Sequence, residues 1–153
     1  MWALEARQRI HLEGATLAHE GMDQFSLNHD PAQDSYHISG YARSSSGRQY
    51  GLCLLIPIGF PYARPPLYLT DPYPLYAADG SKIASLGLSH AMHTLEPHAN
   101  GMVQICHWRD SRWHSGIRLS KVMVKGLLWI EAYEQHLATR QSIAEFVRTM
   151  SET

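Results

Sequence analysis

The sequence predicts an α+β fold, in which helices near the two ends of the chain enclose a run of antiparallel strands. Three observations predict it: apolar residues recur at helical spacing near both ends, they alternate with polar residues in between, and residues 71–101 follow neither pattern. Strands and helices that occupy separate stretches of a chain are typical of the α+β class. With 153 residues the chain has the length of one domain, which we expect to span residues 1–153.

The first helix is expected over residues 3–13, which contain no glycine or proline. Glu5 precedes Arg9 by about one helical turn, a spacing that stabilises a helix through an ion pair. Gly14 follows directly, and a glycine at this position is a typical stop signal for a helix.

Four strands are expected next, as an antiparallel meander. Apolar residues alternate with polar ones around Phe25 and around Tyr36, which is the period of a half-buried strand, and Asp30-Pro31 separates the two runs. Residues 50–58 are almost continuously apolar, as is typical of a central strand buried on both faces. Residues 67–70 are expected to form the fourth strand.

Residues 71–101 are expected to form a long loop, because prolines and Asp-Gly and Asn-Gly pairs interrupt every periodic pattern there. Loops of this length in a compact domain are usually functional. Two amphipathic helices then follow. The first covers residues 119–136 with Ser120 as its candidate cap, and the second opens with Ser142 and Glu145 in capping-box spacing and reaches Met150.

Composition argues against two classes of partner. Thirteen Lys and Arg residues against fourteen Asp and Glu residues give a formal net charge of -1, so no global field attracts nucleic acid or anionic membranes. The first residues carry charges where a signal peptide would be apolar, and Pro57 and Pro61 break the least charged stretch, residues 49–63. We therefore expect a soluble cytoplasmic protein with no nucleic-acid or membrane partner.

The two cysteines lie in different surroundings. Cys53 lies within the apolar run 50–58, which predicts an inert core thiol. Cys106 follows the long loop and has His107 and Arg109 close by, so its thiol could be exposed and its thiolate favoured by a neighbouring cation. From spacing alone, Cys106 is either a nucleophile or a structural cysteine.

Five histidines flank Cys106 and raise the alternative of a metal site: His90, His93, His98, His107 and His114. Zinc ligands usually come in close pairs, and only one such pair, His90 with His93, is present. A hydrolase with a Cys-His pair is a further alternative, but no third residue that would orient the histidine can be singled out. We expect no metal and no other cofactor.

Three motifs occur in an informative order: IPIGFPYARPPLYL at 56–69, NGMVQIC at 100–106 and WHSGIRLSKVMV at 113–124. Together they resemble the ubiquitin-conjugating enzyme family, which has a strand followed by Phe-Pro, Tyr and Pro-Pro, an Asn and a Gly shortly before Ile-Cys or Val-Cys, and a Trp followed by a helix. The resemblance covers nearly the whole chain. It implies a ubiquitin-conjugating-enzyme-like fold with an N-terminal helix, a four-stranded antiparallel meander, a long active-site loop and two C-terminal helices.

The chain also departs from the family pattern. His98-Ala99-Asn100 stands where the family has His-Pro-Asn, and it lies closer to the cysteine. Residues 71–93 look like an insertion, and His107 follows the cysteine where the family often has Leu. The acidic residue often found near the attacking amine has no secure counterpart. These departures, with the closing segment 129–143, resemble diverged bacterial members encoded beside an activating enzyme and a deconjugating peptidase, some of them in antiphage defence operons.

The resemblance implies that Cys106 accepts a ubiquitin-like modifier as a thioester from an activating enzyme and transfers it to a target amine or other nucleophile. Asn100 is the candidate donor to the oxyanion, although Asn100-Gly101 is equally a simple turn. His98 is the candidate that orients the loop, and His107 is a candidate acid or base. The expected partners are the activating enzyme, the modifier and a target protein. The alternative is a catalytically inactive module of the same fold that binds the modifier or a partner.

Overall fold

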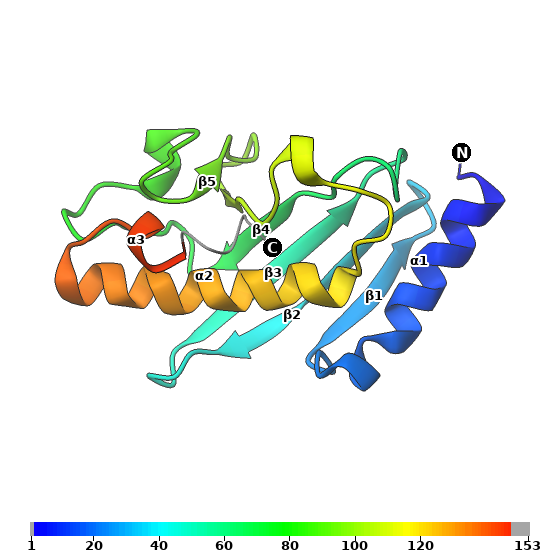
Figure 1. Cartoon of the computed structure of the whole chain (residues 1–153), viewed down its shortest axis with the longest axis horizontal. Helices are drawn as coiled ribbons and strands as arrows, with labels where there is room; N and C mark the ends of the chain where they lie inside the picture. The colour runs from blue at the N-terminus through cyan, green and yellow to red at the C-terminus, as the bar shows by residue number, and fades with distance from the viewer. Residues whose placement is uncertain (1, 148–153) are drawn as a thin grey trace.

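The computed structural model describes residues 2–147 and has the predicted α+β architecture (Figure 1). Its helices are α1 (Leu4–Thr16), α2 (Leu119–Thr139) and α3 (Ala144–Val147), with short 3-10 turns at Ala18–Glu20, Ile83–Leu86 and Asp110–Arg112. Its strands are β1 (Phe25–Asp30), β2 (Ser35–Arg43), β3 (Gln49–Ile56), β4 (Leu67–Asp71), β5 (Thr94–Leu95) and β6 (Val103–Ile105). Met150, which the pattern predicts on the last helix, lies outside the described residues.

The six strands form one antiparallel sheet in the order β1-β2-β3-β4-β6-β5. Strands β1 to β4 confirm the predicted meander, because each pairs with its neighbour in sequence. Strand β5 lies within residues 71–101, where we expected a long loop, and β6 follows that stretch; both extend the sheet. They contain two and three residues, too few for an alternating pattern to be visible in the sequence.

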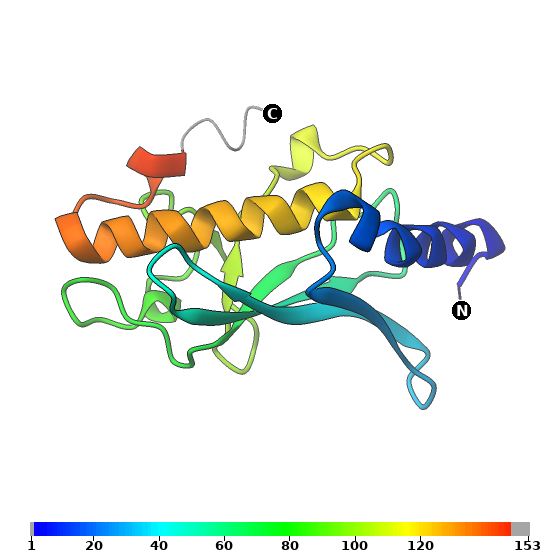
Figure 2. The same cartoon turned by 90° about the horizontal axis from the view of Figure 1, so that it is seen from below.

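The two faces of β3 differ in burial. Leu52 and Leu54 point to the face that α2 covers and are almost completely buried, whereas Cys53 and Leu55 on the other face are half-buried. The expectation that this strand is buried on both faces is therefore wrong. Figure 2 shows the reason, since α1 and α2 lie on the same side of the sheet.

Two glycines let the helices approach the sheet closely. A Cβ added to Gly126 of α2 would lie 2.9 Å from Leu67 Cδ2, and a Cβ added to Gly14 of α1 would lie 2.8 Å from Leu27 Cβ. Helix α1 runs past Gly14 to Thr16, so this glycine serves close packing and does not end the helix. Within residues 2–147, no helix is long and apolar enough to cross a membrane.

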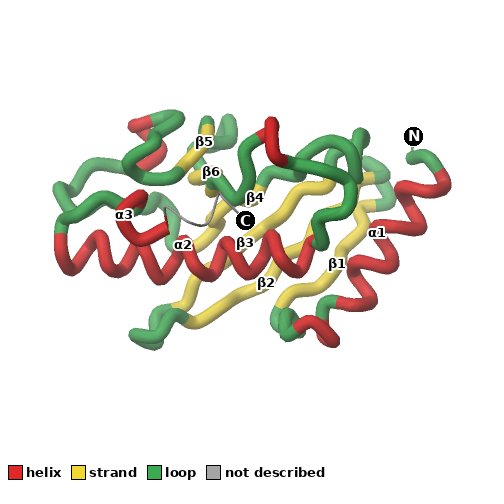
Figure 3. The backbone as a smooth tube through the Cα atoms, in the orientation of Figure 1, coloured by secondary structure: helices red, strands yellow, loops and turns green. Residues whose placement is uncertain are grey.

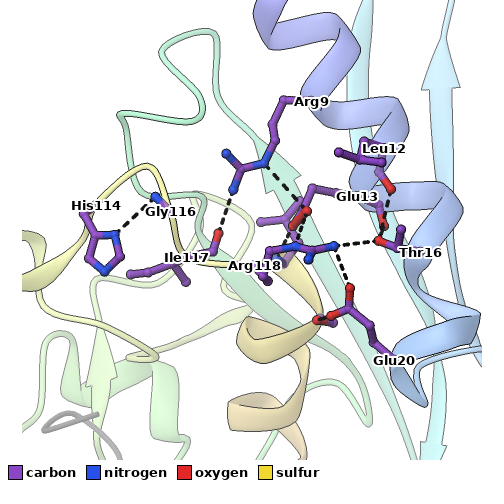
Figure 4. A network of polar contacts seen from close by, with 11 residues as sticks. Arg9, Leu12, Glu13, Thr16, Glu20, His114, Gly116, Ile117 and Arg118 are labelled. Atoms are coloured by element: carbon purple, nitrogen blue, oxygen red, sulfur yellow. Dashed lines mark hydrogen bonds and ion pairs between the residues drawn. The ribbon is translucent and has the colours of Figure 1, made fainter.

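A buried carboxylate joins α1 to the start of α2 (Figure 4). Glu13 is 2% exposed, and its Oε1 accepts the backbone N–H of Leu119 at 2.6 Å while its Oε2 accepts Arg118 Nε at 2.7 Å. Glu13 thus satisfies an N–H group that the first turn of a helix leaves without an intrahelical partner. Ser120, the predicted cap, lies inside the helix, and its hydroxyl donates to Glu20 instead.

Candidate active site

The segment between β4 and β5, drawn as loop and one short 3-10 turn in Figure 3, is fastened to the C-terminal half of α2. Three side chains on one face of α2 make these contacts: Trp129 Nε1 donates to the Met92 carbonyl (3.0 Å), the Tyr133 hydroxyl donates to the Tyr76 carbonyl (2.7 Å), and His136 Nε2 accepts from the Ala78 N–H (3.0 Å). Leu75, Ile83 and Met92 of this segment also join the hydrophobic core. The segment is therefore an ordered wall beside the sheet.

The β5–β6 hairpin places His93 opposite Cys106. Thr94 pairs with Ile105 in the register of the two strands. One residue further along, the Cys106 N–H donates to the His93 carbonyl at 3.1 Å. His93 has a φ of 56°, in the left-handed region that few residues other than glycine adopt. The reversal of the chain at this point brings the end of the segment 71–93 next to the cysteine.

A cavity of about 510 Å³ opens beside the hairpin, and both Cys106 and His93 line it. Its remaining walls come from the segment before β5, the chain after Cys106 and the start of α3: Leu88, Ser89, His90, Thr94, Leu95, Arg109, Arg112, Ala144 and Glu145. A thiol that lines a cavity of this size is accessible to a chemical group that enters it. The thiol is half-buried, so a substrate would approach it from this side.

Opposing effects act on the thiol of Cys106. Burial raises its pKa above the usual value, whereas the positive charges of Arg64, Arg109 and Lys125 lower it, and the carboxylate of Asp110 raises it. Burial is the largest of these effects, so the group is protonated at neutral pH. The three cations stabilise the negative charge that the sulfur carries once the thiol is deprotonated.

One of these positive charges belongs to Lys125, a residue of α2. Its side chain is buried, and Nζ lies 3.3 Å from the centre of the Trp108 ring, which is a cation–π contact. The pKa of Lys125 is lowered to about 8, mainly by burial and also by the charge of Lys121, while Cys106 acts to raise it. At pH 7 the group still carries its charge. The long helix therefore places a cation beneath the loop that carries the thiol.

His107 lies away from this cavity. Its ring is fully buried, Nε2 donates to the Pro65 carbonyl at 2.6 Å, and it packs edge-on against Trp108 and Trp113 with centroid distances of 6.0 Å. Burial lowers the pKa of His107 to about 3, so the ring is neutral. These contacts do not support the predicted role of His107 as an acid or base, because the ring does not line the cavity and its N–H is engaged by the backbone.

His98 and Asn100 lie at the turn of the hairpin, at the far end of β6 from Cys106. His98 Nδ1 accepts the Asn100 N–H at 3.2 Å, and Asn100 Oδ1 accepts the Met102 N–H at 3.0 Å. The Tyr73 hydroxyl donates to the Asn100 carbonyl. The three residues of β6 separate this turn from Cys106, and three residues of a strand span about 10 Å. The structure therefore does not bring Asn100 to the thiol. His98 orients the turn itself and not the cysteine.

His93 is the site residue that sequence reasoning missed. In the sequence it stood among five histidines with no sign that it faces the thiol. The useful signal was the Asn-Gly turn, because counting outward from a hairpin turn places the residues around Thr94 opposite Cys106. This relation was not apparent from the sequence, because the two strands of the hairpin are too short to be recognised there.

Among the residues described, no three His, Cys, Asp or Glu side chains are grouped so that they could hold a metal ion. Comparisons with known proteins add no family: no protein-family model matches the chain, and no curated protein matches it. Fold and site together define an α+β protein with a half-buried thiol beside a cavity. Its function is inferred from these residues and from the resemblance of the three motifs.

Proposed function

We propose that this protein is a ubiquitin-conjugating-like enzyme that carries the C-terminal acyl group of a ubiquitin-like modifier as a thioester on Cys106. The observation that carries the proposal is the position of Cys106, which directly follows strand β6 and lines a cavity of about 510 Å³. The order of helix, meander, cysteine loop and helices agrees with what the resemblance implies. The proposed setting is a bacterial conjugation system, including antiphage defence.

The first step is transfer from the activating enzyme. The sulfur of Cys106 attacks the carbonyl carbon of the modifier's thioester, a new C–S bond forms, and the C–S bond to the activating enzyme breaks. The proton of the Cys106 thiol ends on the departing sulfur. No oxidant or reductant is needed, because one thioester replaces another.

The second step is transfer to the acceptor. A target amine attacks the same carbonyl carbon, an amide forms, and the C–S bond to Cys106 breaks. The proton lost by the amine ends on the Cys106 sulfur, which restores the thiol. Both steps pass through a tetrahedral oxyanion, which hydrogen-bond donors in the cavity stabilise.

The test is to incubate the protein with ATP and with the activating enzyme and ubiquitin-like protein encoded beside it, and to compare gels run with and without thiol reductant. We expect an adduct that reductant removes and that Cys106→Ala does not form. Cys106→Ser is expected to form a reductant-resistant ester, because oxygen replaces sulfur. Cys53→Ala is the matched control and is expected to form the normal adduct, since Cys53 lies on another strand.

One observation favours the alternative, a module that binds the modifier or a partner without catalysis. Burial raises the pKa of Cys106, as it does for an inert structural thiol. A binding module would retain its biological activity and its partner binding in Cys106→Ala. The conjugating enzyme would lose the activity and keep the binding.

A further inference from the structure

We infer that His93, and not Asn100, donates the hydrogen bond that stabilises the oxyanion during acyl transfer at Cys106. This inference rests on the proposed thioester chemistry and names the residue that assists it. It gives a role to the buried histidine that the structure places beside the thiol.

The backbone places the two residues together. The His93 carbonyl accepts the Cys106 N–H at 3.1 Å, directly beyond the pair formed by Thr94 and Ile105. Both side chains also line the same cavity. An acyl group on Cys106 Sγ would therefore lie within reach of the imidazole.

The ring of His93 lacks a protein partner where one is expected. The residue is 8% exposed, and among residues 2–147 its buried Nε2 has no hydrogen-bond partner. Leaving a buried polar atom unpaired costs about 1–3 kcal/mol. In the free protein Nε2 is enclosed, so the ring has to turn within the cavity wall before this nitrogen can donate to a bound carbonyl oxygen, which would remove that cost.

The backbone of His93 is also held in an uncommon conformation. A non-glycine residue with a φ of 56° is strained and persists only where its surroundings fix it. Here the His93 N–H donates to the His90 carbonyl at 3.2 Å, and the His93 carbonyl is held by Cys106. Such strain is concentrated at functional sites. The side chain of this residue lines the cavity.

The charge state suits a donor. The pKa of His93 is lowered to about 4, mainly by burial and also by the charges of His90, Lys125 and Arg109, while the hydrogen bond with the backbone of Cys106 acts to raise it. The ring is therefore neutral at physiological pH, with one N–H that it can donate while keeping its proton. A neutral histidine stabilises a developing oxyanion in the same way in other enzymes. The role requires the tautomer with the proton on Nε2.

The experiment measures discharge of the thioester in a single turnover. Protein charged with the modifier is separated from ATP and the activating enzyme and is mixed with free lysine, and loss of the adduct is followed with time. We expect His93→Ala to slow discharge by about 10² to 10³, the loss seen when a donor to an oxyanion is removed. The competing candidate is tested by Asn100→Ala, which is expected to discharge within about threefold of the wild-type rate.

His93→Gln distinguishes a donor from a base. Its amide N–H can donate a hydrogen bond, but the amide cannot take up a proton. We expect discharge within about tenfold of wild type, and a ratio of wild-type to variant rates that stays constant between pH 6 and 8. A rate for His93→Gln as slow as that of His93→Ala would overturn the donor role, and so would a ratio that changes with pH.

The outcomes separate this inference from the proposed function. If the wild-type protein forms no thioester with a demonstrably charged activating enzyme, the proposed function is wrong and the inference fails with it. If the thioester forms and His93→Ala discharges at the wild-type rate, only the inference fails. Circular dichroism checks that the variants are folded. Where His93→Ala does not fold, the rate and pH dependence of His93→Gln still decide the question.

Discussion

At Cys106, burial and charge act in opposite directions on the same thiol. Burial raises its pKa and keeps it protonated, whereas Arg64, Arg109 and Lys125 favour the thiolate. A thiol in this state reacts slowly with electrophiles that meet it by chance, because the thiolate is the nucleophile. Under the proposed function, the thiol reacts when a bound thioester offers a departing sulfur that can take the proton.

The contribution of one cation can be measured. Arg109→Gln removes an exposed charge that lowers the pKa of Cys106, so we expect the pH dependence of Cys106 alkylation by iodoacetamide to move to higher pH. A single solvent-screened charge at this range is worth about 0.3–0.5 pH unit. Peptide mass spectrometry assigns the alkylation to Cys106 separately from Cys53.

Arg112→Gln is the matched control for this measurement. Arg112 lines the same cavity and is exposed, but its effect on the pKa of Cys106 is smaller than that of Arg109. Its alkylation profile is expected to match that of the wild type. Equal shifts in both variants would show that the thiol responds to net charge and not to the position of Arg109.

At the scale of elements, α2 depends on another helix for its beginning. Its N-cap residue, Arg118, makes no side-chain capping bond, and Glu13 of α1 supplies the acceptor for the Leu119 N–H. The long helix also carries Lys125 beneath the cysteine loop and holds the segment before β5 at its other end. A weakened start of α2 would therefore affect the site as well as the fold.

Glu13→Gln tests this dependence. The amide keeps the size of the side chain but loses the charge-assisted bonds to Leu119 N–H and to Arg118. We expect the free energy of unfolding to fall by about 1–3 kcal/mol, as measured by urea denaturation. Glu5→Gln, an exposed position on the same helix, is expected to change it by less than about 0.5 kcal/mol. Equal stabilities for the two variants would contradict the capping role.

Elements with a long periodic pattern were predictable from the sequence. Helix α2 and strands β1 to β4 lie close to where the apolar patterns place them, and the pattern is longest in α2. Strands β5 and β6 were not predictable, since they contain only two and three residues. Ser120 failed as a cap for a different reason: the acceptor came from Glu13, more than 100 positions away in the chain.

The same limit applies to the candidate site. Cys106 could be singled out because its surroundings in the sequence differ from those of Cys53, and the three motifs gave it a chemical role to test. Its neighbour His93 could not, because the β5–β6 register that joins them depends on strands too short to recognise. The resemblance pointed instead to Asn100, which the hairpin places at its turn, away from the thiol.

At the scale of the whole molecule, two buried neutral histidines make folding sensitive to acid. The pKa of His93 is lowered to about 4 and that of His107 to about 3, whereas an unfolded histidine titrates near 6.5. Between these values the unfolded chain binds protons that the folded chain does not. Stability is therefore fully present above about pH 6.5 and is lost as the pH falls toward 4.

The expected slope is up to about 2.7 kcal/mol per pH unit for the two groups together. Urea unfolding between pH 7.5 and 4.5 measures it. His107→Gln can still donate to the Pro65 carbonyl but does not titrate, so we expect it to remove about half of the slope. His19→Gln, at an exposed position, is expected to leave the slope unchanged. An unaltered slope in His107→Gln would contradict the neutral burial of this ring.

The most direct test of the thioester on Cys106 is intact-mass spectrometry of the protein after incubation with ATP, the activating enzyme and the ubiquitin-like protein. The predicted result is a mass increase equal to the modifier less one water, abolished by hydroxylamine and mapped to Cys106 by digestion. Cys53→Ala is expected to give the same increase. A modifier attached elsewhere, or no increase with a charged activating enzyme, would contradict the acyl-carrier function.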